Sequence, residues 1–157
     1  MNIEFTKEQY KDLIAMVALG NGIVGILGDV LPDTDYKKRS HKTEKLENYL
    51  VQFADEFGVK GIADKETFED RVVLDDDYFG KKIMPVIFDY EDFATHDTLS
   101  KELAMRDFRN DHTEEEIKKM SEESGGYLGV ETFDYEKKYW DEFDEYGFER
   151  LEIVEVK

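Results

Sequence analysis

The sequence predicts a mainly helical α+β fold, in which about four or five helices pack with a small sheet. Apolar residues recur at helical spacing in several long segments, and two capping boxes mark helix starts after Thr6 and Thr113. The two ends of the chain alternate polar and apolar residues, as short strands do. Because 157 residues fit the usual size of one domain, we expect a single globular domain over residues 1–157.

The first helix is expected from about Lys7 into a glycine-rich segment. Thr6 and Gln9 have the spacing of a capping box, in which two free N–H groups at the helix start are satisfied reciprocally. Helical spacing continues in the apolar residues Tyr10, Leu13, Ile14 and Val17. Pro32 follows and ends this helical region.

The glycine-rich segment Gly20-x-Gly22-x-x-Gly25 has the letters of a dinucleotide-binding fingerprint. That motif needs a strand before its first glycine and a helix that begins at its last one, whereas the residues before Gly20 have helical spacing. We therefore interpret Ala15, Ala18, Gly22 and Gly25 as a stripe of small residues that lets another element pack closely. A break in the helix near Gly20 is the alternative.

The uncharged segment from Leu13 to Gly28 contains sixteen residues and has to be tested as a membrane span. A span needs about 18 to 20 consecutive apolar residues, and this segment includes Asn21 and four glycines. No small-residue cleavage site of a signal peptide follows it. We expect a buried core helix, and the absence of cysteine suits a cytoplasmic location.

The second helix is expected from about Thr43 to Phe57, with Gly58 as a left-handed C-terminal cap. Its predicted apolar face consists of Leu46, Tyr49, Leu50, Phe53 and Phe57. Branched and aromatic residues then favour strands at Phe68–Leu74 and Ile83–Phe88.

A third helix is predicted over Asp97–Phe108, and a fourth begins at the capping box of Thr113 with Glu116. Ser124–Gly129 is expected to be a flexible loop because it is rich in glycine. A last amphipathic helix, which Gly147 should end, has an aromatic side made of Tyr135, Tyr139, Trp140, Phe143 and Tyr146.

Both ends of the chain are predicted to be short strands. Asn2–Phe5 alternates polar and apolar residues, and Leu151, Ile153 and Val156 alternate with two glutamates. The two terminal strands could pair with each other in the small sheet.

Several blocks of the sequence are similar to a known group of proteins. The blocks are residues 6–21 (TKEQYKDLIAMVALGN), 46–58 (LENYLVQFADEFG), 101–108 (KELAMRDF), 114–121 (EEEIKKMS) and 140–153 (WDEFDEYGFERLEI). Together they resemble a group of short, acidic, uncharacterised bacterial proteins. The resemblance implies a soluble, mainly helical protein of bacterial or phage origin, and it assigns no activity to any residue.

The charge of the chain excludes several classes of ligand. With 39 acidic and 21 basic residues, the net charge is −18, which should repel nucleic acid and anionic lipid. We therefore expect no direct nucleic-acid binding and no membrane association. The acidity increases along the chain: residues 1–60, 61–110 and 111–157 carry net charges of −2, −6 and −10.

The acidic C-terminal part, residues 111–157, is the candidate for partner binding. The carboxylates proposed to contact a partner are Asp141, Glu142, Asp144, Glu145, Glu149 and Glu152. Such a face would dock on a basic protein surface, and it could imitate nucleic acid, because duplex DNA carries about one charge per 1.7 Å. A nucleic-acid-binding or defence enzyme would be the natural partner. The alternative is that the aromatic side of the last helix is core and its acidic side is merely solvated.

Catalytic and metal sites have weaker support. Asp75, Asp76 and Asp77 form an acidic triplet that could bind Ca²⁺ or Mg²⁺, although a solvated acidic turn is the preferred interpretation. His41, His96 and His112 show no metal-binding spacing, and each is expected at the surface or as a cap. No nucleophile or phosphate-binding motif is present, and no cofactor is expected. A housekeeping domain or a metal-dependent enzyme is therefore the alternative to a non-enzymatic binding protein.

Overall fold

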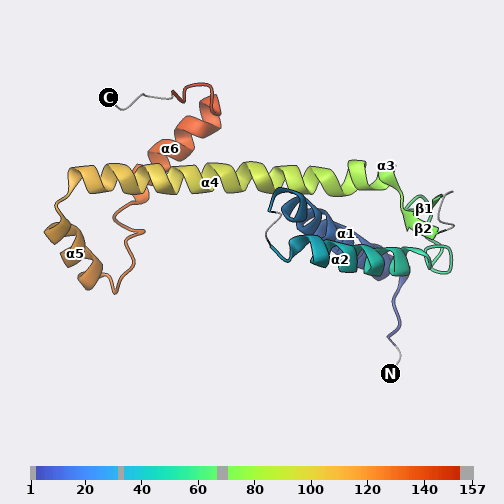
Figure 1. The fold of residues 1–157 in the computed structure, drawn as a ribbon. Helices are drawn as coiled ribbons and strands as arrows, with labels where there is room; N and C mark the ends of the chain where they lie inside the picture. The colour runs from blue at the N-terminus through green and yellow to red at the C-terminus, as the bar shows by residue number, and fades with distance from the viewer. Residues whose placement is uncertain (1–2, 32–33, 67–70, 153–157) are drawn as a thin grey trace. The chain divides into compact units, whose positions relative to one another are not determined.

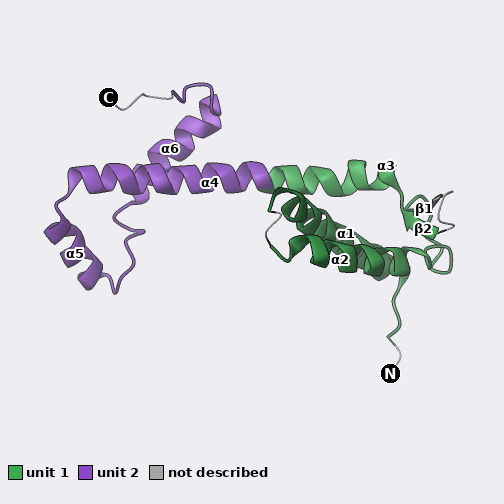
Figure 2. Ribbon diagram, in the orientation of Figure 1, with its two compact units in different colours: residues 1–90 green, residues 91–157 purple. Residues whose placement is uncertain are grey.

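The structure is a computed structural model that describes residues 3–31, 34–66 and 71–152. Its elements are mostly helices, with one small antiparallel sheet, so the mainly helical α+β class is confirmed (Figure 1). The contacts within the chain form two compact units, unit 1 at Met1–Tyr90 and unit 2 at Glu91–Lys157 (Figure 2). The single domain over residues 1–157 stays a prediction, and we describe each unit by itself.

Unit 1 begins with two long helices that pack side by side, α1 (Lys7–Val30) and α2 (Tyr36–Val51). The predicted capping box starts α1: Thr6 Oγ1 accepts from the Gln9 N–H at 3.3 Å, and Gln9 Oε1 accepts from the Thr6 N–H at 3.0 Å. These two bonds satisfy backbone donors that have no partner inside the helix. The first helix start is therefore confirmed.

Helix α1 continues through the glycine-rich segment without a break, so the alternative of a break near Gly20 is wrong. A Cβ atom on Gly22 would lie 2.9 Å from Ile87 Cδ1, and one on Gly28 would lie 3.0 Å from the backbone N and Cα of Lys37. Since such distances are too short for real Cβ atoms, the small residues are what allow this close packing. The predicted stripe is confirmed at Gly22, whereas a Cβ atom on Gly25 would lie in ordinary contact with Ser40 Oγ at 3.8 Å. The close approach at Gly28 is not part of the predicted stripe. Residues 7–30 are helical, so no strand ends at Gly20 as a dinucleotide site requires.

The apolar residues of α1 are divided between a buried and an exposed side. Tyr10, Ile14 and Ala18 belong to the core, whereas Met16 and Val30 are exposed. By length and composition, α1 is the one candidate membrane span among the described residues. The whole helix has 24 residues, whereas its uncharged segment has sixteen. A mostly buried core helix of a soluble protein and an N-terminal signal sequence pass the same test, and 17% of the apolar window of α1 is buried. The cytoplasmic location therefore stays a prediction.

Helix α2 begins earlier than expected, at Tyr36 instead of about Thr43, and its regular part ends at Val51. Turns continue to Gly58, whose φ is 65°, and the Val59 N–H donates to the Ala54 carbonyl at 2.8 Å. This bond and the left-handed glycine end the turns, but the C-cap of α2 is Gln52, so the prediction that the helix reaches Phe57 and is capped by Gly58 is wrong.

The predicted apolar face of this segment is wrong in part. Leu46 and Tyr49 are exposed, and Glu47, Val51 and Ala54 are buried instead. Helix α2 packs on the side of α1 that contains Gly25 and Gly28. The α2 residues at this contact include polar and small side chains, so the spacing of apolar residues does not predict which side of α2 is buried.

The small sheet is a two-stranded antiparallel hairpin of β1 (Ala63–Glu66) and β2 (Arg71–Leu74). Strand β2 confirms the second half of the strand predicted at Phe68–Leu74, and residues 68–70 lie outside the described residues. The predicted strand at Ile83–Phe88 is wrong, since the chain there is helical. Ile83 and Ile87 are both buried at the i, i+4 spacing of a helix, which a short apolar segment does not distinguish from a strand.

After the sheet, the chain forms the short helix α3 (Asp76–Tyr78), the π-helical turn η1 (Phe79–Ile83) and the long helix α4 (Met84–Asp111). Helix α4 contains the helix predicted at Asp97–Phe108. The core of unit 1 gathers aliphatic and small side chains with one tyrosine: Tyr10, Ile14, Ala18, Val51, Ala54, Val59, Ile62, Leu74, Ile83 and Ile87.

The predicted terminal strands are not seen in the described residues. Residues 3–6 and 151–152 have no regular secondary structure, and Asn2 and residues 153–157 lie outside the described part. The strand at Ile3–Phe5 is therefore wrong. A single short strand is stable only when a neighbouring strand pairs with it, and β1 and β2 pair with each other.

Unit 2 contains the rest of α4 together with α5 (Glu114–Glu123) and α6 (Phe133–Tyr146). The capping box of Thr113 with Glu116 is confirmed at the start of α5. Ser124–Gly129 is a loop of turns, as predicted, in which Gly125 and Gly126 have positive φ. Gly147 ends α6 at a φ of 56°. The buried apolar side chains of unit 2 are Ala104, Phe108 and Phe143.

Candidate acidic interface on helix α6

Helix α6 has an aromatic side and an acidic side, as its sequence predicts. Phe143 is buried, and Tyr139 and Trp140 are half-buried. The Phe143 ring lies 5.3 Å from the Phe148 ring, centroid to centroid. Asp141, Asp144 and Glu145 are exposed, and their i, i+3, i+4 spacing places them on one solvent-facing side.

The six candidate carboxylates fall into two groups. Asp141 pairs with Lys137, one helical turn before it, and the half-buried Glu142 pairs with Arg150 at 3.1 Å between Oε1 and Nε. The four others are exposed and have no ion pair among the described residues; they are Asp144, Glu145, Glu149 and Glu152. The first pair of carboxylates is therefore partly neutralised by the chain itself, and the second group keeps its charge available to solvent.

One of these exposed carboxylates interacts with a neighbouring ring. A hydrogen bond to Glu145 raises the pKa of the Tyr146 phenol, because the phenol proton is held by the carboxylate. The guanidinium carbon of Arg150 lies 4.3 Å from the centroid of the same ring. The C-terminal end of α6 thus combines carboxylates and aromatic faces, which are both groups that attract cations.

A polar cluster joins α6 to α4 and was not predicted. The Tyr139 hydroxyl donates to Asp107 Oδ2 at 2.5 Å, and the Arg106 guanidinium donates to Asp107 Oδ1 at 2.7 Å and to the Tyr139 hydroxyl oxygen at 2.9 Å. Lys138 Nζ lies 3.3 Å from Asp107 Oδ2. The Tyr139 hydrogen bond, with those from Arg106 and Lys138, lowers the pKa of Asp107 to about 2. Since 32 residues separate Asp107 from Tyr139, no local pattern could have indicated this pair.

The three histidines have different surroundings. His41 is exposed near Glu44, and His112 Nδ1 lies 3.0 Å from the Phe108 carbonyl oxygen, so both fit the prediction of surface or cap positions. The prediction is wrong for His96. Its half-buried ring lies among those of Trp140, Phe143 and Phe148, at centroid distances of 6.4, 5.8 and 5.0 Å.

The aspartate triplet has local structural contacts. Asp75 Oδ1 accepts from the Tyr78 N–H at 2.7 Å and so caps α3, and Asp77 pairs with Lys81 at 2.5 Å. Within residues 3–31, 34–66 and 71–152, no group of three or more histidine, cysteine, aspartate or glutamate side chains could hold a metal ion. The triplet stays an untested candidate that these contacts do not strengthen.

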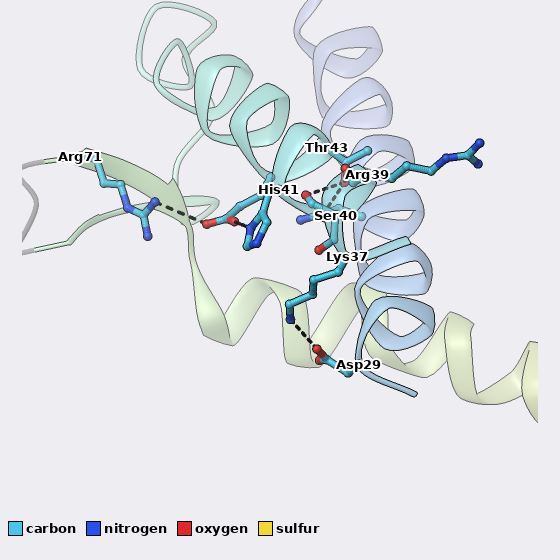
Figure 3. A network of polar contacts seen from close by, with 9 residues as sticks. Asp29, Lys37, Arg39, Ser40, His41, Thr43 and Arg71 are labelled. Atoms are coloured by element: carbon cyan, nitrogen blue, oxygen red, sulfur yellow. Dashed lines mark hydrogen bonds and ion pairs between the residues drawn. The ribbon is translucent and has the colours of Figure 1, made fainter. Parts of the chain in front are cut away.

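Unit 1 contains a polar network between α1 and α2 (Figure 3). The Thr43 hydroxyl donates to Asn21 Oδ1 at 2.7 Å, Lys37 pairs with Asp29 at 2.5 Å, and Arg71 reaches from β2 to Glu44 at 3.4 Å. These contacts link α1, α2 and β2 and have the character of structural ties rather than of a reactive site.

Glu47 on α2 is the buried charged residue of unit 1. It is 7% exposed, and its Oε2 atom has no hydrogen-bond partner among the described residues. Burial raises the pKa of Glu47, although a hydrogen bond from Asn21 acts in the opposite direction. This burial could not be predicted from the sequence, because a glutamate on a helix is usually exposed.

We compared the chain with protein-family models, curated proteins and solved structures. No protein-family model, no curated protein and no solved structure matches the chain.

Proposed function

We propose that the protein is a non-enzymatic binding protein whose acidic α6 surface docks on a basic surface of another protein. The observation that carries the proposal is a group of exposed carboxylates at the C-terminal end of α6 and in the residues after it, which have no ion pairs among the described residues: Asp144, Glu145, Glu149 and Glu152. Carboxylates that the chain does not neutralise keep their full attraction for an external cation.

The charge of the whole unit supports the same proposal. Unit 2 contains 21 acidic and 9 basic residues, a net charge of −12, whereas unit 1 has 18 and 12, a net charge of −6. A surface of one sign steers an oppositely charged partner toward it and speeds association, and this effect weakens as salt increases. Binding by this surface should therefore be strongly salt-dependent.

The partner class follows from the chemistry of the surface. A protein that binds nucleic acid presents a basic face that is already complementary to a polyanion. An acidic protein surface can compete for that face, and a competitor of this kind would inhibit the partner. We propose a nucleic-acid-binding protein, such as a defence enzyme, as the partner, and the cytoplasm as the place where the two meet.

The proposal is tested by affinity capture from a bacterial lysate at about 0.05 M and about 0.5 M salt, a range in which the screening length falls severalfold. The bait is the full chain, and a second bait carries Asp144→Asn, Glu145→Gln and Glu149→Gln. We expect a basic partner that the native bait retains at low salt, and that is lost both at high salt and with the substituted bait. A partner that both baits retain equally, or no partner lost at high salt, contradicts the proposal.

A further inference from the structure

Within unit 2, Arg150 is bound by an aromatic ring and a carboxylate, the same groups with which an acidic surface can bind an arginine of a partner. The Arg150 guanidinium carbon lies 4.3 Å from the centroid of the Tyr146 ring, and Arg150 Nε lies 3.1 Å from Glu142 Oε1. The ring face attracts the cation through its quadrupole, and the carboxylate supplies the ion pair. A ring and a carboxylate together thus form a receptor for a guanidinium group.

The same combination occurs a second time in unit 2, on α4 and α6. The aromatic-acidic patch, as we call it, consists of Asp92, Phe93, Trp140, Asp144 and Phe148. The Phe93 and Trp140 rings lie 5.8 Å apart, centroid to centroid. Asp144 is one helical turn after Trp140, where side chains on a helix are about 5–6 Å apart at Cβ. Asp144 therefore leaves α6 next to Trp140 along the helix, and the Phe93 ring reaches Trp140 from α4.

His96 connects the other members of the aromatic-acidic patch. Its ring centroid lies 5.0 Å from that of Phe148 and 6.4 Å from that of Trp140, and its Nε2 atom lies 3.7 Å from Asp92 Oδ1. Asp92 is thus close to the aromatic cluster. The patch has carboxylates from both helices, α4 and α6, around one group of rings.

The patch differs from the Arg150 arrangement in one respect. Among the residues that the structure describes, Asp92 has only His96 as an ion-pair partner, and Asp144 has none. The rings are nevertheless open to solvent, since Phe93 is 57% exposed and Phe148 is 39% exposed. Exposed aromatic residues are frequent anchors of protein interfaces, and these two lie in a unit of net charge −12.

We infer that the aromatic-acidic patch binds an arginine side chain of the basic partner. The inference rests on the proposed function and adds the residue type that is recognised and the place where it binds. Arginine suits the patch better than lysine, because its planar guanidinium stacks on aromatic rings, donates to two carboxylates at once and is more weakly hydrated than an ammonium group. The patch therefore gives the acidic surface a preference among basic partners that charge alone does not supply.

The test uses two defined probes, a peptide of ten arginines and a peptide of ten lysines, with the full chain. Trp140 is the only tryptophan of the protein, so its fluorescence reports binding at the patch, and calorimetry gives the affinity. Three variants are compared with the native chain. Phe93→Ala removes the exposed ring, Phe93→Tyr keeps it, and Phe133→Ala removes an equally exposed ring at the start of α6 that lies outside the patch.

The result is read from the ratio of the affinities for the arginine peptide and the lysine peptide, because any acidic protein binds both peptides to some degree. We expect Phe93→Ala to weaken binding of the arginine peptide by about two- to fivefold, the range of an exposed cation–π contact, and to leave the lysine peptide nearly unchanged. Phe93→Tyr and Phe133→Ala should behave as the native chain does, and only the arginine peptide should shift Trp140 emission strongly. Circular dichroism verifies that each variant is folded.

The outcomes separate this inference from the proposed function. If both peptides bind and Phe93→Ala weakens neither of them selectively, the arginine site is refuted and the acidic docking surface stands. If neither peptide binds at low salt, the docking surface itself is refuted, and the arginine site with it.

Discussion

The two units of the protein pack their helices with different kinds of side chain. Unit 1 has an aliphatic core and a stripe of small residues, so α1 approaches α2 and the start of α4 closely at Gly28 and Gly22. Unit 2 buries few apolar side chains and relies on aromatic contacts around Phe143 and on the polar cluster at Asp107. Aromatic and charged groups thus hold unit 2 together, and the same two kinds of group are exposed on its surface.

The difference between the two units indicates which of them contains the candidate binding surface. In unit 1 the glycines are explained by close packing, at Gly28 against α2 and at Gly22 against η1 and the start of α4. In unit 2, Asp144 and Glu145 of α6 are exposed and have no ion pair among the described residues, and Phe93 is 57% exposed although its ring contacts Trp140. Unit 1 accordingly has the properties of a scaffold, and unit 2 has those of a binding surface.

The close packing in unit 1 predicts the largest effect on stability. In Gly28→Ala the new methyl group would meet the Lys37 backbone at 3.0 Å, and a backbone cannot move aside as a flexible side chain can. We expect a loss of about 1–3 kcal/mol in the free energy of unfolding, measured by urea denaturation.

Gly20→Ala is the matched control, since a Cβ atom there would meet nothing within 4 Å. Replacing this exposed glycine inside the helix should stabilise the protein by about 0.5–1 kcal/mol. If both variants were stabilised equally, close packing against the Lys37 backbone would not be the reason for the glycine at position 28.

The buried Glu47 predicts a stability that depends on pH. Burial raises its pKa in the folded state above the value of 4.5 for a free side chain, so folding favours the protonated carboxyl group. Its contribution is fully present below pH 4.5 and is lost as the pH rises through the raised pKa. Glu47→Gln should therefore stabilise the protein at pH 7 by about 1 kcal/mol and change little at pH 4.

Thermal unfolding at both pH values measures this effect. Asp55→Asn is the control, because Asp55 is exposed just after α2 and is not among the groups that shift the pKa of Glu47. That variant should be neutral or slightly destabilising at both pH values. A Glu47→Gln variant with the same pH profile as the native chain would show that Glu47 is solvated.

The polar cluster of unit 2 predicts a smaller effect. Tyr139→Phe removes the hydrogen bond that most lowers the pKa of Asp107 and should cost about 0.5–1.5 kcal/mol at pH 7. NMR titration should show the Asp107 pKa moving from about 2 toward its ordinary value of 3.8. The native cluster stabilises the fold above pH 3.8 and loses this contribution as the pH falls toward 2, so the variant should be less sensitive to acid in that range.

Tyr135→Phe provides the comparison for this experiment. Tyr135 also donates to a carboxylate of α4, Asp111, at 3.0 Å, and it is not hydrogen-bonded to Asp107. The Asp107 pKa should stay near 2 in this variant. An Asp107 pKa that is equally low in Tyr139→Phe would mean that Arg106 and Lys138 are sufficient to hold it.

The features that local chemistry determines could be predicted from the sequence. Both capping boxes and the cap at Gly147 depend on residues within a few positions of one another, and all three are confirmed. Helix starts without such a signal were missed. The start of α4 at Met84 is the clearest case, because Ile83 and Ile87 fit a strand or a helix equally in a short segment.

The candidate site was predictable only in its composition. The acidic side of α6 follows from the sequence, because helical spacing places Asp141, Asp144 and Glu145 together. Which carboxylates the chain itself neutralises depends on tertiary contacts such as Arg150 with Glu142. His96 among aromatic rings is likewise a contact between two helices that lie far apart in the sequence.

The central claim is that the location of the charge on α6, and not the total charge, determines binding. Two triple variants change the net charge by the same amount: Asp144→Asn with Glu145→Gln and Glu149→Gln in unit 2, and Glu4→Gln with Asp12→Asn and Asp55→Asn in unit 1. All six side chains are exposed. The most direct measurement is the affinity of each variant for the salt-sensitive partner, by calorimetry at low salt. We predict a loss of about tenfold or more for the α6 variant and little change for the unit 1 variant, whereas equal losses in both would contradict the account.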